Sequence, residues 1–231
     1  MFLMVKLSHV VPFGRSLAEY RLMFNLTDLD LSRDILDAGG GPASFNAEMH
    51  QLGYRVISID PIYQFSGAEI EQRFYACASD IIRQVKDMPD GWVWGYHQSP
   101  DDLLRNRETA LRRFLADYDQ GKAEGRYLVG ELPDLPLSDR PYDLMLCSHL
   151  LFLYSDHLSL EMHCRSIAAL MVRGQELRIF PLLTLERVRS PHLEPVCEVL
   201  TDLGYRVEIV PVRYELQKGG NEMLRVTRLA V

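Results

Sequence analysis

The 231-residue sequence lacks a long hydrophobic run and a leader of the secretory kind. Its most apolar stretch, residues 144–154, is interrupted by Ser148 and His149 and is too short to cross a bilayer. The apolar residues 1–5 are followed at once by Lys6 and further polar residues, unlike a signal peptide. These absences predict a cytoplasmic protein that has no membrane partner.

Cysteine and basic charge are also scarce. The four cysteines form no CxxC pair and lie in apolar surroundings, which predicts buried thiols in a reducing compartment: Cys77, Cys147, Cys164 and Cys197. Lys and Arg number 25 against 32 Asp and Glu, a formal net charge of −7. Broad binding of nucleic acid needs an excess of cations near phosphates, so this charge argues against a nucleic-acid partner.

Metal ligands are scarce as well, although His157, His163 and Cys164 lie close together in the sequence. Adjacent positions on a helix point in different directions, so His163 and Cys164 cannot both face one ion. We therefore predict no metal site.

What the chain does contain is an alternation of short apolar runs with helical periodicity, which is typical of a parallel sheet covered on both faces. The expected strands are residues 34–36, 55–59, 126–129, 142–147 and 176–180, followed by a hairpin of 206–216 and 223–228. Pro211 cannot donate a ladder hydrogen bond, which places the first hairpin strand at a sheet edge.

About 65 residues separate the second and third expected strands, where a crossover needs about a dozen. This segment predicts two helices, the second capped by Ser99. Arg105, Arg107, Arg112 and Arg113 are expected on its solvated face. Trp92, Trp94 and Tyr96 lie between the helices and either pack inside the insertion or cover an apolar ligand. The expected organisation is one domain, 1–231, with an N-terminal helical segment, 13–33, and a helical insertion, 66–125.

Ligands of open α/β sheets bind at the carboxyl ends of the strands. Asp37 and a glycine cluster end the first strand, and Asp60 ends the second, where its carboxylate can accept hydrogen bonds from ribose hydroxyls. Ser44 stands where a dinucleotide fingerprint requires glycine. Asp37 would repel a pyrophosphate but suits a cationic amino group, which favours S-adenosylmethionine over a dinucleotide.

These segments resemble the motifs of class I S-adenosylmethionine-dependent methyltransferases. Residues 35–42 resemble the first motif, although Ala43 replaces its usual final glycine. Residues 56–60 resemble the second motif, 130–133 the element after the third strand, and 142–149 the fourth motif. The resemblance implies a Rossmann-like, seven-stranded, mostly parallel sheet with an antiparallel terminal hairpin and a helical insertion between strands 2 and 3.

The resemblance also implies a role for each motif residue. The methionine end of S-adenosylmethionine would lie against Asp37, Gly39, Gly40 and Gly41, with Arg15 near its carboxylate. The nucleoside would lie against Asp60, Pro61, Glu131 and Leu132, and the methyl group would face Ser148 and His149. Structural roles remain open for several of these residues: a turn cap for Asp60, a buried carboxylate for Asp37, and a solvated surface for Arg15.

His149 is the candidate catalytic residue. It could take a proton from a protic acceptor, orient the acceptor or the cofactor carboxylate, or serve only as a structural residue. The fourth motif lacks the Pro-Pro-aromatic pattern of enzymes that methylate nucleic-acid bases, so a small-molecule acceptor is expected. The alternative is a protein that binds the cofactor without transferring a methyl group. The Pro211 edge and the apolar residues 229–231 leave room for a homodimer.

Overall fold

The computed structural model describes residues 11–137 and 140–229. In this part of the chain seven strands form one sheet in the order β3-β2-β1-β4-β5-β7-β6. The strands are β1 (Ile35–Ala38), β2 (Val56–Ile59), β3 (Tyr127–Leu128), β4 (Tyr142–Ser148), β5 (Gly174–Phe180), β6 (Tyr205–Pro211) and β7 (Glu222–Arg228). The first five pair in parallel, whereas β7 runs antiparallel to both β5 and β6. The expected sheet and its terminal hairpin are confirmed.

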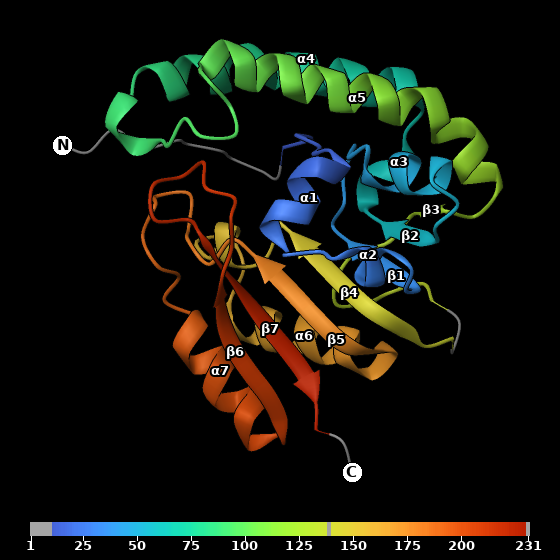
Figure 1. The fold of residues 1–231 in the computed structure, drawn as a ribbon, viewed down its shortest axis with the longest axis vertical. Coiled ribbons are helices and arrows are strands. Elements are labelled where there is room, and N and C mark those ends of the chain that lie inside the picture. Colours follow the sequence, from blue (N-terminus) through green and yellow to red (C-terminus); the bar gives the residue numbers. More distant parts are fainter. Residues whose placement is uncertain (1–10, 138–139, 230–231) are drawn as a thin grey trace.

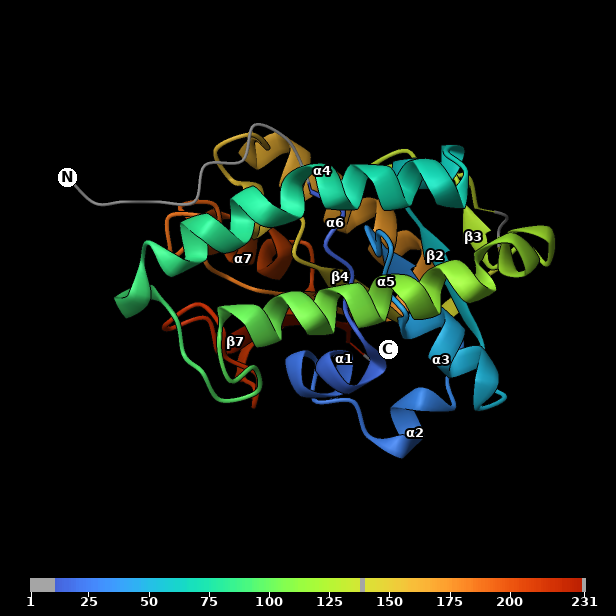
Figure 2. The same cartoon turned by 90° about the horizontal axis from the view of Figure 1, so that it is seen from above.

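Helices cover both faces of the sheet, as Figure 2 shows from above. One layer consists of α1 (Leu17–Met23), α2 (Asp28–Leu31) and α3 (Phe45–Gln51); the other of α6 (Leu160–Arg173) and α7 (Leu193–Asp202). Successive side chains of β4 point to opposite faces. Leu144 and Leu146 therefore pack with the first layer, and Met145 and Cys147 with the second. Burial on both faces explains why β4 reads as an unbroken apolar run.

The segment between β2 and β3 forms the two expected helices, α4 (Gly67–Lys86) and α5 (Pro100–Ala123). They lie side by side across the carboxyl ends of the parallel strands (Figure 1). Ser66 caps α4 in a capping box, and the Ser99 side chain accepts from the Asp102 amide at the start of α5. No helix in the described residues combines the length and apolarity needed to cross a membrane.

The sequence misplaced one strand end. The strand expected at 206–216 ends at Pro211, because the chain then turns toward the insertion, where the Val93 amide donates to the Leu216 carbonyl. The edge position of β6 agrees with the proline argument. The helix α3 ends at Gln51, and its C-cap Leu52 is 58% exposed just before Gly53, which has a φ of +80°.

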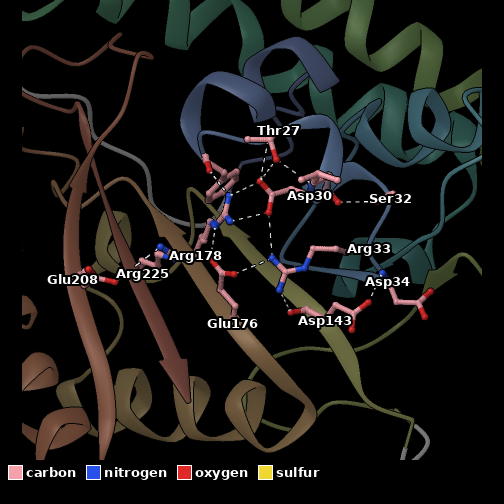
Figure 3. A network of polar contacts seen from close by, with 12 residues as sticks. Thr27, Asp30, Ser32, Arg33, Asp34, Asp143, Glu176, Arg178, Glu208 and Arg225 are labelled. Carbon is pink, nitrogen blue, oxygen red and sulfur yellow. Dashed lines mark hydrogen bonds and ion pairs between the residues drawn. The ribbon is translucent and has the colours of Figure 1, made fainter. Parts of the chain in front are cut away.

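A network of ion pairs fastens α2 to the sheet (Figure 3). Arg178 on β5 pairs with Asp30 at 2.9 Å, and Arg33 pairs with Glu176 at 2.8 Å. Arg225 on β7 also reaches Glu176, at 2.7 Å. These residues form what we call the anchor cluster: Asp30, Arg33, Glu176, Arg178, Glu208 and Arg225.

Candidate active site

A glycine turn joins β1 to α3 at the carboxyl edge of the sheet. Gly39 and Gly41 have φ of +74° and +54°, a region that residues with a Cβ rarely adopt. A Cβ on Gly39 would also lie 2.6 Å from Leu150 Cδ2. The turn therefore brings bare backbone close to whatever lies above the sheet edge.

Asp60, at the end of β2, is tied directly to this turn. Its Oδ2 accepts from the Gly41 amide at 2.9 Å, and its Oδ1 accepts from the Ile62 amide at 2.8 Å. Burial raises the pKa of Asp60 to about 6 despite these two hydrogen bonds. The ends of the two strands that the sequence singled out are thus one hydrogen bond apart.

Three cavities lie along this edge. The largest has a volume of about 570 Å³, and we call it the nucleoside cavity after the ligand that the sequence predicts there. Its lining includes six predicted residues: Gly39, Gly41, Asp60, Pro61, Glu131 and Leu132. Apolar side chains of Leu135, Leu158 and Met162 complete part of its wall. Its size falls in the range that suits a small organic ligand.

A narrow channel of about 40 Å³ continues from the nucleoside cavity, with which it shares Gly39, Gly41 and Asp60. The remaining predicted residues that line it are Arg15, Gly40, Ser148 and His149. A third cavity of about 110 Å³ shares Arg15 and His149 with the channel, and we call it the acceptor cavity after the role proposed for it below. It lies beneath α4 and α5, and the rest of its wall comes from residues 11–15 and from the segments that follow β4, β5 and β6.

Asp37 is the one predicted site residue that lines none of these cavities. It is buried, and a Cβ on Gly40 would lie 2.2 Å from its Oδ2. Tyr20 donates to Oδ1 at 3.0 Å and Ser58 donates to Oδ2 at 3.2 Å. Burial raises the pKa of Asp37 to about 7, although both hydroxyls act against the rise. Contact of Asp37 with a cationic amino group stays a prediction.

Arg15 carries a buried charge at the junction of the channel and the acceptor cavity. One terminal nitrogen donates to the Phe13 carbonyl at 2.6 Å, whereas Nε is buried and has no hydrogen-bond partner. No carboxylate of the described residues forms a salt bridge with it. Burial and the charge of Arg107 lower the pKa of Arg15 to about 10. An anionic ligand group would satisfy this guanidinium.

Arg107 corrects the expected solvated face of α5, because its side chain is only 1% exposed. It donates to both oxygens of Glu19, at 2.7 and 2.9 Å. Burial alone would raise the pKa of Glu19, but Arg107 and a hydrogen bond from His97 hold it well below its ordinary value. Arg105, Arg112 and Arg113 are exposed or partly exposed, as expected.

The sequence held a signal for Arg107 that its neighbours lack. Leu103, Arg107 and Leu111 follow one another at helical spacing, and all three are buried. A charge inside an apolar stripe requires a buried partner. Nothing in the sequence identified Glu19, or Tyr214 beside it, as that partner.

His149 follows β4 in a left-handed conformation, with φ of +53°. Its amide donates to the Phe180 carbonyl at 2.6 Å, and the two rings lie edge to face at 5.3 Å. Nδ1 lies 2.9 Å from the Ser148 hydroxyl. Burial, together with the charges of Arg15 and Arg107, holds the pKa of His149 well below its ordinary value. The imidazole is therefore neutral at physiological pH.

Comparison with solved structures identifies the fold. The mitomycin 7-O-methyltransferase MmcR matches with a TM-score of 0.50 and 15% identity, over 92% of this chain and 54% of that one. Magnesium protoporphyrin IX methyltransferase from Synechocystis PCC 6803, with bound SAM, matches with a TM-score of 0.47 and 16% identity, over 87% and 73% of the two chains. The chain has the class I methyltransferase fold.

The sequence comparison identifies a relative. The uncharacterized protein MJ0045 of Methanocaldococcus jannaschii is 31% identical over 228 residues, which cover 97% of this chain and 99% of the relative. The chain belongs to the same family as that protein. No family model matches the sequence.

Proposed function

We propose that the protein is an S-adenosylmethionine-dependent methyltransferase that acts on a small molecule. One observation carries the proposal: three cavities run end to end along the carboxyl edge of the sheet. The turn at Gly39 and Gly41 links the first to the second, and Arg15 and His149 link the second to the third. A nucleoside, an amino-acid tail and an acceptor would occupy the three cavities in that order.

The residues present suit this cofactor. Asp60 would bind the ribose hydroxyls, since each carboxylate oxygen can accept a further hydrogen bond besides the one from backbone. Glu131 and Leu132 would hold the adenine at the other end of the nucleoside cavity. The unpartnered Arg15 Nε would donate to the carboxylate of the amino-acid tail, a charge-assisted hydrogen bond.

When bound, S-adenosylmethionine supplies an electrophilic methyl group. The chain itself would supply alignment, because the displacement needs the acceptor in line with that methyl group. His149, at the junction of the channel and the acceptor cavity, is placed beside the reacting atoms. The α4–α5 pair would keep water away from them. The presence of an acceptor cavity favours transfer over a protein that only binds the cofactor.

Calorimetry with S-adenosylhomocysteine and, separately, NAD⁺ tests the cofactor assignment. We expect saturable binding of the former and none of the latter. Incubation with methyl-labelled S-adenosylmethionine and a small-molecule cell extract then tests transfer. Failure to bind S-adenosylhomocysteine would refute the proposed function, and binding without any labelled product would favour the non-transferring alternative.

A further inference from the structure

A chain of buried polar side chains leads from Asp37 to His149. The Tyr20 hydroxyl lies 3.0 Å from Asp37 Oδ1, and the Ser148 hydroxyl lies 2.9 Å from His149 Nδ1. Ser148 and Tyr20 both line the channel, and Ser148 acts against the burial that raises the pKa of the Tyr20 phenol. Tyr20 is fixed in place by stacking on Phe45, with ring centroids 4.2 Å apart and planes inclined by 8°. The four groups come from α1, β1 and the end of β4.

The carboxylate sets the direction of every hydrogen bond in this chain. Ionised Asp37 can only accept, so Tyr20 must donate to it. With its proton directed at Asp37, the phenol oxygen can only accept from Ser148, whose own oxygen would then accept from the Nδ1–H of His149. A neutral imidazole has a single N–H, so Nε2 keeps a free lone pair. Nε2 has no hydrogen-bond partner within the described residues, and the ring lines the acceptor cavity.

We propose that Asp37, Tyr20 and Ser148 hold His149 in the tautomer whose Nε2 takes a proton from a hydroxyl acceptor. This proposal rests on the proposed function and names its acceptor chemistry. As the acceptor oxygen bonds to the methyl carbon, its O–H proton passes to Nε2, and the electron pair of the breaking S–C bond stays on sulfur. The imidazolium then returns the proton to solvent. Tyr20, Ser148 and Asp37 are positioning residues in this scheme.

The acceptor cavity also points to an uncharged acceptor. The charge of Arg107 is met by Glu19, and Arg15 would be met by the cofactor carboxylate. Most of the remaining wall is apolar, including Phe13, Leu103 and Phe180. Its volume of about 110 Å³ is below the roughly 150 Å³ of a cavity that accepts benzene, so its occupant is limited to about one aromatic ring. The geometry thus favours a neutral phenol or similar hydroxyl compound.

Trp92 also lines this cavity, and its indole Nε1 is buried without a hydrogen-bond partner in the described part of the chain. The fluorescence of this side chain can therefore report whether a ligand enters the cavity.

The tautomer of His149 is directly measurable without any ligand. Two-dimensional ¹H–¹⁵N spectra of histidine-labelled protein, recorded above the Asp37 pKa of about 7, distinguish a proton on Nδ1 from one on Nε2. His149→Gln identifies the signals by removing them. We expect the proton on Nδ1. A proton on Nε2 in the wild-type protein would overturn the proposal.

Two variants interrupt the chain, and one serves as control. Tyr20→Phe and Ser148→Ala should move the His149 proton to Nε2 in part or in full, and should slow transfer. Tyr142→Phe removes a buried phenol at the start of β4 and should leave the tautomer unchanged. An unchanged tautomer in Tyr20→Phe would exclude the role of Tyr20. If S-adenosylhomocysteine binds but the tautomer is wrong, only the base assignment fails.

The acceptor class is tested with three matched probes on protein saturated with S-adenosylhomocysteine: p-cresol, p-toluate and 4-methylbenzylammonium. Quenching of Trp92 fluorescence reports entry, and Trp92→Phe should abolish the response. We expect p-cresol to bind most tightly. Tightest binding of p-toluate would show an uncompensated cation in the acceptor cavity and would overturn the neutral class. Once an active acceptor is found, His149→Gln should slow its methylation by about 10²–10⁴-fold.

Discussion

Two groups of buried charges in this molecule differ in their balance. In the anchor cluster, three guanidiniums face three carboxylates, so each charge has a partner. Beside the acceptor cavity, Arg107 donates to the single carboxylate of Glu19, and no carboxylate of the described residues forms a salt bridge with Arg15. A buried charge without a partner destabilises the folded state, so the second group is not arranged for stability. An anionic group of the proposed ligand would correct this imbalance.

The carboxylates show the same contrast. Although burial opposes it, hydrogen bonds from Thr27 and the charge of Arg178 lower the pKa of Asp30 to about 2. Burial raises the pKa of Asp37 to about 7. The hydrogen bonds that Asp37 accepts come only from hydroxyls, which do not offset the effect of burial. Five substitutions test whether the two groups of charges differ in this way.

Arg178→Met should cost about 3–5 kcal/mol of unfolding free energy, because it removes the most buried guanidinium beside Asp30 and Glu176 and leaves them only the more exposed Arg33 and Arg225. Urea unfolding at neutral pH measures the loss. Glu71→Gln, an exposed change on α4, is the control and should have little effect. A loss of unfolding free energy below about 1 kcal/mol would show that the anchor cluster does not stabilise the folded state in this way.

Asp37→Asn should become stabilising relative to wild type as the pH rises. The folded pKa of about 7 exceeds the unfolded value near 3.8, so the stability that protonated Asp37 contributes is lost between those pH values as the pH rises. The gap between variant and wild type should grow by up to about 1.4 kcal/mol per pH unit in that window.

Asp30→Asn provides the opposite sign, because the folded pKa of Asp30 lies below its unfolded value. Its destabilisation should be full above about pH 4 and should shrink as the pH falls further. Thermal unfolding of both variants across the pH range measures the two slopes. Slopes of the same sign would contradict the assigned pKa directions.

Asp60→Ala should weaken S-adenosylhomocysteine binding by about 1–3 kcal/mol, the loss expected when hydrogen bonds to a charged group are removed. Calorimetry at pH 7.5 measures it. Asp119→Ala, on the exposed face of α5, serves as the matched control. Equal affinities for the two variants would remove Asp60 from the site.

Arg15→Met should have the smallest effect on stability, a change of at most about 1 kcal/mol and toward higher stability, since it removes a buried cation without a salt bridge. The same change should weaken S-adenosylhomocysteine binding. Replacement by Met would then raise the free energy of unfolding at Arg15 and lower it at Arg178. A loss comparable to that of Arg178→Met would show that Arg15 has an undetected structural partner.

The fold could be predicted from local patterns. The patterns used were a glycine at a turn, apolar runs of strand length and the Ser99 cap. Each of them involves only a few neighbouring residues, so it can be recognised in a single sequence. Most of the candidate site followed as well, because parallel strands bring their carboxyl ends to one edge. Gly39, Asp60, Glu131 and His149 come from four different strand ends and line the connected cavities.

The partners of the buried charges could not be predicted. Glu19 and Arg107 are 88 residues apart, and Tyr20 and Asp37 meet only because α1 folds back over the sheet. Such contacts depend on how layers pack, about which periodicity says nothing. Asp37 is an example: the sequence predicted its position in the motif, but not that its side chain would be buried against Gly40.

The cover formed by α4, α5 and the segment after β6 has a consequence for how relatives can diversify. The cover contributes Ile81, Val85 and Tyr214 to the acceptor cavity, whereas the nucleoside cavity belongs mainly to the strand ends and the segments beside them. Exchanges at such cover positions are therefore expected to change which molecule fits while the strand ends stay intact.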